Sequence, residues 1–394
     1  FDGSGLESVV LSGTTENFGD NKTFEELTTL VEARLYSVAA FDAVVNGTGI
    51  TASDIEEDRE GVVYTNINFY QKLVKNEEWH KYLRYNIVVD NLIDVLSSTN
   101  ELISYHSNLE DAVANAQNGN KIVVKSDINL KSTITIDKTI SIYAGYEKLD
   151  SEDRGGITFA RKSDNVAFVV ESNGNVTFGG NFVEGDDATY VNAELDIVGS
   201  KRESADSLIK VNGGTVGFNL GLKIYDHISQ NGSVVYATGG IVSVTGSEIY
   251  NNYAVNNGGV FYITTQAKLI ISRANIHDNG MFDGEVMTKS GGVVFAQDGS
   301  IVEISDKETQ LTNNGAQNGG AIYIDCEDVT STISAGLFSG NTATMSGGAV
   351  LVSAGKLIVT GEVEFYGNSA KNMGGALAVA GGALNINKGV KIGS

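Results

Sequence analysis

The second half of the chain repeats one short pattern about every 28 residues. Each clear copy begins with two glycines and an apolar run, as in GGAIYI at 319 and GGAVLV at 347. The glycine pairs are Gly258 and Gly259, Gly291 and Gly292, Gly319 and Gly320, Gly347 and Gly348, and Gly374 and Gly375. The last four pairs are 28, 28 and 27 residues apart, whereas the first gap is 33 because GMFDGEVMTKS is inserted. So regular a period restricts the chain to architectures in which each unit packs on its neighbours.

Two further elements complete each copy. An alternating run such as IVEI at 301 follows the first run, and a bulky apolar residue then stands three places before an asparagine. These asparagines are Asn252, Asn279, Asn314, Asn341 and Asn368, and Phe178 with Asn181 is a candidate earlier member. Three short strands and three turns in about 27 residues suit one coil of a parallel β-helix, whose equivalent strands pair about 4.8 Å apart. The repeat predicts a mainly β fold, a right-handed parallel β-helix of about ten rungs over residues 121–394.

The recurring glycines and asparagines have physical roles in such a coil. Glycine permits positive φ and close backbone approach at a corner that every coil must turn. Asparagine tolerates the left-handed conformation, and asparagines stacked in register can join coils through an amide ladder. Each buried, paired amide is expected to contribute about 1 kcal/mol.

Alternation along the first run separates an inward from an outward column of side chains. If Val235, Phe261 and Val294 face inward, a mostly aromatic column faces outward. That column is Tyr236, Tyr262, Phe295, Tyr323 and Leu351. We expect an exposed stripe that serves as a binding face, a seam between copies of the chain, or a surface covered by the N-terminal domain. The alternative is that the two columns are assigned the wrong way round.

The first hundred residues lack this repeat and have a different pattern of apolar residues. Apolar residues recur at helical spacing from Thr23 to Val45 and from about Ile67 to Leu96. This spacing predicts a small, mainly helical N-terminal domain over residues 1–105.

A short capping helix is expected in residues 106–120. Ser107 and Glu110 form a candidate capping box at its start. Its apolar side consists of Leu109, Ala112, Val113 and Ala116. A helix placed there would cover the core of the first coil and block edge pairing.

Composition argues against several functions. The chain has 27 Lys and Arg against 49 Asp and Glu, a net charge of -22, which repels nucleic acids and anionic membranes. No run of about 18 apolar residues is present, so we do not expect this segment to span a membrane as a helix. The lone Cys326 has no histidine beside it and is expected to be inert. Because the chain starts at Phe1 and ends partway through a repeat, we expect a longer natural polypeptide.

The sequence shows no catalytic constellation, and no catalytic or cofactor-binding residue is predicted. Sugar-cleaving enzymes of this fold place two or three carboxylates on adjacent coils of one face. Here the first strands carry almost no charge, and the acidic residues gather in turns. The three groups are Asp278, Asp283 and Glu285; Asp325, Glu327 and Asp328; and Asp150, Glu152 and Asp153. We expect solvated charge there, with weak Ca²⁺ binding as the alternative.

The four histidines give no metal signal. They are His80, His106, His227 and His277, and they lack the spacing of a zinc site. His227 and His277 are expected to occupy related turns of different coils.

The paired glycine and asparagine motifs resemble the repeats of chlamydial polymorphic outer membrane proteins and similar repeat adhesins. The motifs are GGAIYI with FSGN and GGALAV with FYGN, and the resemblance covers about residues 175–394. It implies a secreted β-helical passenger that is displayed at the cell surface and binds host or neighbouring surfaces. The chain departs from the pattern where copies read GGV, and where Ile or Leu replaces Phe in three copies.

The sequence thus predicts an extracellular or cell-surface protein without enzymatic activity. It would bind a protein or glycan surface, or assemble with copies of itself. A polysaccharide lyase, glycoside hydrolase or phage-type depolymerase on the same fold is the alternative, and a purely architectural coat subunit is a third possibility. A groove with clustered carboxylates on the outer surface would favour the enzyme, whereas a flat aromatic or asparagine-rich face would favour binding.

Overall fold

The computed structural model describes most of the chain from residue 93 onward and short pieces before it. The described residues are 8–11, 32–35, 41, 62–66, 77–78, 81, 85, 87–90, 93–147, 156–180, 190–201 and 205–393. The chain divides into two compact units, residues 1–94 with 104–111 and residues 95–103 with 112–394. The repeats lie in the second unit.

The first unit contains a four-stranded parallel sheet. Its strands pair in chain order: β1 (Ser8–Leu11), β2 (Glu32–Leu35), β3 (Val62–Asn66) and β4 (Ile87–Asp90). Ala33 and Leu35 on β2 are buried, and Thr65 Oγ1 on β3 donates a hydrogen bond of 2.6 Å to the Leu35 carbonyl.

The predicted helices of the N-terminal region are wrong at the strands that the structure describes. β2 lies inside the predicted helix 23–45, and β4 and β5 (Ile93–Leu96) lie inside the predicted helix 67–96. Phe41 is helical and residues 77–78 and 81 form tight 3₁₀ turns, while most other positions of both segments lie outside the described residues. A four-residue strand directs only two side chains into the core. The apolar residues of several short strands can therefore recur along the sequence at intervals that also suit a helix.

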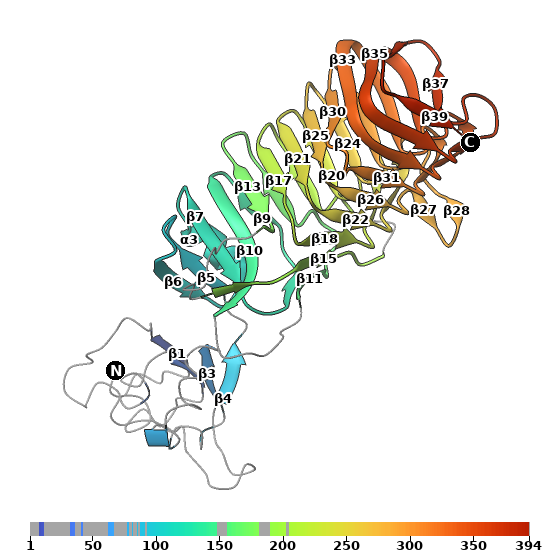
Figure 1. The fold of residues 1–394 in the computed structure, drawn as a ribbon. Coiled ribbons are helices and arrows are strands. Elements are labelled where there is room, and N and C mark those ends of the chain that lie inside the picture. Colours follow the sequence, from blue (N-terminus) through green and yellow to red (C-terminus); the bar gives the residue numbers. More distant parts are fainter. Residues whose placement is uncertain are drawn as a thin grey trace. The chain divides into compact units, whose positions relative to one another are not determined.

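Strands of the second unit form three long parallel stacks, seen side by side from green to red in Figure 1. The first stack contains β9 (Ile134–Ile136), β12 (Phe168–Val170), β16 (Ile209–Val211), β20 (Val235–Thr238), β24 (Phe261–Thr264), β29 (Val294–Gln297) and β37 (Leu377–Val379). The second contains β7 (Asn120–Val124), β10 (Thr139–Glu147), β13 (Asn175–Phe178), β17 (Thr215–Phe218), β21 (Ile241–Thr245), β25 (Lys268–Ser272), β30 (Ile301–Ser305) and β38 (Ala383–Ile386). The third contains β8 (Ile128–Leu130), β11 (Ile157–Arg161), β15 (Leu195–Val198), β18 (Leu222–Tyr225), β22 (Glu248–Tyr250), β26 (Asn275–His277), β31 (Gln310–Thr312) and β39 (Lys391–Gly393). The long strands β33 (Ile322–Ser339) and β35 (Val350–Tyr366) take part in all three stacks.

Each strand pairs with its equivalent one coil later, where a coil is one passage of the chain through the three stacks. Val235 pairs with Phe261, and Phe261 with Val294. All three side chains are fully buried, whereas the neighbouring Tyr236 and Tyr262 are only partly buried. Burial therefore confirms the predicted inward column.

A fourth short strand follows the asparagine in several coils, which the repeat did not predict. β19 (Ile228–Asn231) pairs with β23 (Tyr253–Asn257), and β32 (Gly315–Asn318), β34 (Thr342–Ser346) and β36 (Ser369–Ala370) form a second short stack. The insertion at 280–290 instead forms a hairpin of β27 (Met281–Phe282) and β28 (Glu285–Val286). Two further strands are β6 (Leu102–His106) and β14 (Tyr190–Asn192), the latter antiparallel to β10.

A short helix, α3 (Leu109–Asn115), lies where the capping helix was expected, and Leu109, Ala112, Val113 and Ala116 are buried as predicted. Its cap is Asn108 rather than Ser107, because Asn108 Oδ1 accepts a 2.8 Å hydrogen bond from the Asp111 N–H. At the other end, Lys138 Nζ donates to the carbonyls of Val113, Ala114 and Ala116 at 3.1 to 3.3 Å. A lysine at this place satisfies carbonyls that the helix leaves free.

The two glycines of each pair are needed for different reasons. The first has positive φ, 59° at Gly319 and 69° at Gly347. The second does not, but a Cβ at Gly320 would collide with the carbonyl oxygen of Gly348 on the next coil. In the coil before Gly258 the sequence reads Asn231-Gly232-Ser233, so a Cβ is accommodated at the second place there, and the Ser233 hydroxyl donates a hydrogen bond to the Gly259 carbonyl.

The repeated asparagines form a continuous buried ladder. The backbone N–H of Asn279 donates to Asn314 Oδ1 at 3.0 Å, and Asn279 Nδ2 donates to the same oxygen at 3.1 Å. Asn279 Nδ2 also reaches the Ile249 carbonyl of the preceding coil at 2.9 Å. The same three contacts recur from Asn252 to Asn368, and all of these asparagines except the half-buried Asn368 are fully buried.

Phe178 is not an early member of the asparagine motif. It lies on β13 of the second stack and pairs with Phe218, whereas the residues before the ladder asparagines lie on the third stack. Asn181 lies outside the described residues. Phe178 packs instead in the core, with its ring centroid 5.0 Å from that of Phe168.

His227 takes the place of an asparagine at the start of the ladder. Its N–H donates to Asn252 Oδ1 at 3.0 Å, and its Nε2 lies 3.3 Å from the Ile197 carbonyl. Its Nδ1 is buried and has no hydrogen-bond partner among the described residues. His277, by contrast, lies on β26 in register with Tyr250, so the two histidines do not occupy related turns, contrary to the prediction.

We expect His227 to make the fold sensitive to acid. Burial, reinforced by the charge of Arg161, lowers the pKa of His227 from 6.5 to about 3. Below pH 6.5 the unfolded chain binds a proton that the folded chain does not, so the free energy of unfolding falls as pH falls toward 3. The slope approaches about 1.4 kcal/mol per pH unit for this one group. His227→Asn should remove that contribution in denaturant unfolding measured from pH 7 to 4, and an unchanged slope would contradict the assignment.

Candidate functional site

The outward column of the first stack is the candidate site predicted from alternation. The strand pairing places Tyr236, Tyr262, Phe295, Tyr323 and Leu351 in direct register on five successive coils. Lys210 precedes Tyr236 in the same column, and Ala378 follows Leu351. We call Tyr236, Tyr262, Phe295 and Tyr323 the aromatic ladder.

Rings of the aromatic ladder stack face to face. The centroids of Tyr236 and Tyr262 are 4.8 Å apart with an interplanar angle of 6°, and the next two steps are both 5.2 Å. The stripe is less exposed than predicted, because Phe295 is 7% and Leu351 4% exposed and the three tyrosines are half-buried. Each ring covers the face of its neighbour, so the ladder offers ring edges and phenol groups to a partner rather than open ring faces.

The Tyr262 hydroxyl of this ladder is a hydrogen-bond donor at neutral pH. Burial, with the neighbouring Tyr236 and the charge of Asp298, raises the pKa of Tyr262 to about 12. Asp298 is held beside the ladder by hydrogen bonds from Thr264 at 2.6 Å and from Gln297 at 3.0 Å. A phenol that stays protonated next to a fixed carboxylate favours polar ligands.

A hollow of about 290 Å³ adjoins the Tyr236 end of the ladder. Its polar lining includes Lys210, Asp206, Gln230 and Asn231. The ladder and the hollow are continuous through Tyr236, so a partner lying along the coils can contact both.

A second outward face, on the third stack, was missed by sequence reasoning. Asp196, Lys223 and Glu248 are in register on successive coils, beside a row in which Tyr225, Tyr250 and His277 stack at 4.8 and 5.2 Å. Burial raises the pKa of Asp196, and Lys223 Nζ bonds Glu194 at 3.0 Å. The coils at residues 190–250 lack the GGA motif, so the register of these residues could not be read from the repeat.

The acidic turns that the structure describes are not arranged as a metal site. Among the described residues no group of three or more His, Cys, Asp or Glu side chains is arranged to hold a metal ion. Asp278 instead lies 2.7 Å from His277 Nδ1, whose Nε2 lies 3.2 Å from Glu248. Asp150, Glu152, Asp153 and His80 lie outside the described residues, and His106 lies 2.8 Å from Ser104.

Cys326 is a core residue. It is fully buried, and burial raises the pKa of its thiol to about 12. A thiol that stays protonated is a poor nucleophile, which agrees with the expected inert side chain.

Comparison with known proteins finds one family, in the region where the repeat is most regular. In the part of the chain that the structure describes, no helix has the length and apolar character of a membrane span. No curated protein and no solved structure matches the chain. Residues 336–353 match the Chlamydia polymorphic membrane protein repeat, and this segment holds both the FSGN turn with Asn341 and the corner of Gly347 and Gly348.

Proposed function

We propose that residues 121–394 form a right-handed parallel β-helix that is secreted or displayed at a cell surface and acts as an adhesin-like binding rod. The helix α3 would cover the core of the first coil of this β-helix. Its partner would be a protein or glycan surface, or other copies of the chain, and no catalytic step is assigned to it.

The observation that carries this proposal is the structural identity of the coils around the matched segment. Residues 336–353 match the Chlamydia repeat, and Asn341 within them makes the same ladder contacts as Asn252, Asn279 and Asn314. These shared contacts support the proposal that several consecutive coils are repeats of the same kind. Such repeats support a surface location, as expected for polymorphic membrane proteins.

The aromatic ladder is the proposed contact face. It presents half-buried tyrosines, with neighbouring rings close to 5 Å apart, on a stack of parallel strands. Ordered aromatic side chains lose little entropy on binding, and their hydroxyl groups add hydrogen bonds.

A polysaccharide-cleaving enzyme is the second candidate, favoured by the third-stack face. Asp196, with its raised pKa, and Glu248 lie two coils apart, about 10 Å by strand spacing. Inverting glycosidases separate their carboxyl groups by about 6.5 to 9.5 Å. Lys223 lies between the two in register, which leaves less room for a sugar than an open pair would.

Binding can be tested with variants that keep the stacking and remove only the hydroxyl groups. Tyr262→Phe combined with Tyr323→Phe should weaken binding to a glycan array or to cell surfaces about tenfold, because two hydrogen bonds of about 0.7 kcal/mol each are lost. Tyr262→Ser with Tyr323→Ser should abolish it. Tyr366→Phe is the matched control, since Tyr366 is 62% exposed and lies off the ladder.

Two outcomes would overturn the proposal. Undiminished binding by the folded double Ser variant would remove the aromatic ladder as the contact face. Release of shortened saccharides that stops in an Asp196→Asn variant would favour the enzyme instead.

A further inference from the structure

The hairpin at 281–286 is the one insertion that interrupts the regular repeat after residue 258. Its turn residues Asp283 and Gly284 both have positive φ, 49° and 80°, the signature of a tight two-residue hairpin. The base is fixed because the Gly280 carbonyl accepts hydrogen bonds from the N–H groups of Met287 at 2.9 Å and Thr288 at 3.1 Å. The hairpin is therefore an ordered wall on the side of the stack.

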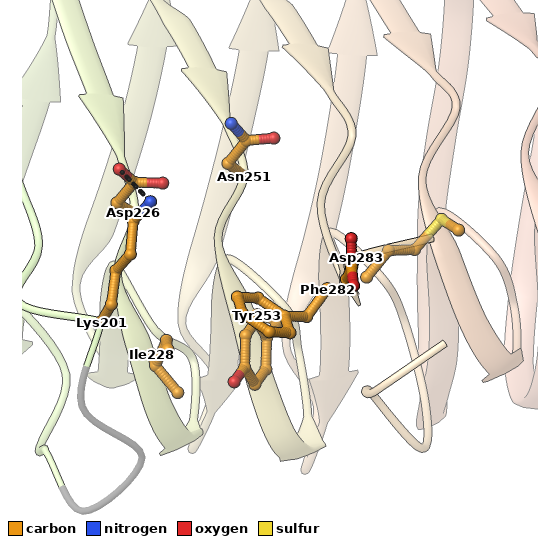
Figure 2. A pocket seen from close by; sticks show the side chains of 8 residues that line it. Lys201, Asp226, Ile228, Asn251, Tyr253, Phe282 and Asp283 are labelled. Carbon is orange, nitrogen blue, oxygen red and sulfur yellow. Dashed lines mark ion pairs between the residues drawn. The ribbon is translucent and has the colours of Figure 1, made fainter. Parts of the chain in front are cut away.

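This wall closes a pocket of about 190 Å³ against the fourth strands. Figure 2 shows the rings of Tyr253 and Phe282 close together, with Asp226 and Asn251 on the adjoining turns. The two ring centroids are 5.8 Å apart. Tyr253 is 2% exposed, whereas Phe282 is 51% exposed, so the pocket has a fixed aromatic floor and an open aromatic edge.

The pocket carries one carboxylate that is not neutralised. Lys201 Nζ lies 3.1 Å from Asp226 Oδ2, an ion pair that Figure 2 marks at the pocket edge. Asp283, on the hairpin turn, makes no hydrogen bond or ion pair with the other described residues. The net charge of -22 adds to the negative potential around it.

We infer that this pocket binds a cationic side chain, lysine or arginine, of a protein partner. A cation that lies over an aromatic ring and beside a carboxylate is attracted by both groups. The attraction to the ring is stronger where the ring is partly shielded from water. Asp283 supplies the charge and Phe282 the ring, while Tyr253 and Ile228 exclude water beneath. This site is separate from the aromatic ladder and is independent of its proposed role.

The charge requirement is tested with two peptides of nearly the same shape, one with a charged guanidinium and one with a neutral urea group. The probes are Gly-Gly-Arg-Gly-Gly and the same peptide with citrulline in place of arginine, titrated against the full chain by ligand-observed NMR. We expect the arginine peptide to bind at least tenfold more tightly. Raising the salt concentration should reduce that difference.

Variants of the hairpin locate the site. Asp283→Asn keeps the turn, because asparagine also tolerates positive φ. It should weaken binding of the arginine peptide at least fivefold. Phe282→Ala should weaken it at least threefold. Glu285→Gln is the matched control on the same hairpin outside the pocket and should change binding less than twofold.

Equal binding of the arginine and citrulline peptides would overturn the inference, as would unchanged binding by Asp283→Asn. Binding of glucose or another neutral sugar that Phe282→Ala abolishes, without binding of the arginine peptide, would assign the pocket to a saccharide instead.

Discussion

Gly320→Ala is expected to destabilise the protein by about 3 kcal/mol or more, an unusually large effect for adding one methyl group. The new Cβ would collide with the carbonyl oxygen of Gly348 and lie 2.7 Å from that of Thr342, and the N–H groups of both residues are hydrogen-bonded to neighbouring coils. Neither carbonyl can move without disturbing the backbone hydrogen bonds between neighbouring coils. Thermal unfolding followed by circular dichroism, with limited proteolysis, measures the loss.

Gly375→Ala is the matched control. Gly375 is the second glycine of the last pair, and a Cβ there meets only the Asn368 carbonyl, at 3.4 Å. The substitution should shift the unfolding midpoint by less than a third of the Gly320→Ala shift. Equal shifts would show that the glycine is required by its own backbone and not by the coil above it.

Asn314→Ala is expected to cost about 3 to 5 kcal/mol, because several buried groups lose their partners together. Asn314 Oδ1 accepts from the N–H and the Nδ2 of Asn279, and Asn314 Nδ2 donates to the Ile276 carbonyl at 3.0 Å. Alanine removes the side-chain partner of the Asn279 N–H and of the Ile276 carbonyl, while Asn279 Nδ2 keeps only its bonds to the Ile249 and His277 carbonyls. Equilibrium unfolding in denaturant gives the change.

Asn368→Ala provides the comparison within the same ladder. Asn368 makes similar bonds, to Asn341 and the Phe338 carbonyl, but it is only half-buried. Water can replace part of the lost hydrogen bonds. We therefore expect the free energy of unfolding to fall by less than half as much as in Asn314→Ala. If the two variants lose the same stability, burial is not what makes the ladder strong.

The stacks could be predicted because the spacing of the repeat sets the register of their strands. Val235, Phe261 and Val294 alternate with Tyr236, Tyr262 and Phe295 at equal distances from the glycine corners, so inward and outward columns could be assigned without coordinates. The low exposure of Phe295 could not be foreseen, because it depends on how neighbouring rings rotate to cover one another.

One constraint of the repeat was overlooked although it is visible in the sequence. The residue before each ladder asparagine has positive φ: Asp226, before His227, then Asn251, Asp278, Asn313, Gly340 and Gly367. Only glycine, asparagine and aspartate occupy this place, and these are the residues that adopt this conformation at least cost. The motif is better written as a bulky residue, any residue, one of these three, and asparagine.

The pocket beside Phe282 and the N-terminal strands could not be predicted for a different reason. The pocket joins Lys201, Tyr253 and Asp283, which come together only when the length of every intervening coil is known. In the first unit the paired residues Ser8 and Glu32 are 24 positions apart, and Glu32 and Val62 are 30 apart, without a shared motif to reveal the period.

Along the asparagine ladder, the spacing between coils does not depend on the number of residues in each coil. Asn279 and Asn314 are 35 residues apart and Asn314 and Asn341 are 27 apart, yet both steps have hydrogen bonds of 3.0 and 3.1 Å. Extra residues are accommodated at the rim while the axial rise of the backbone stays constant. A protein built in this way can exchange or lengthen its peripheral loops during evolution, and so vary what it recognises, without disturbing the column that holds them.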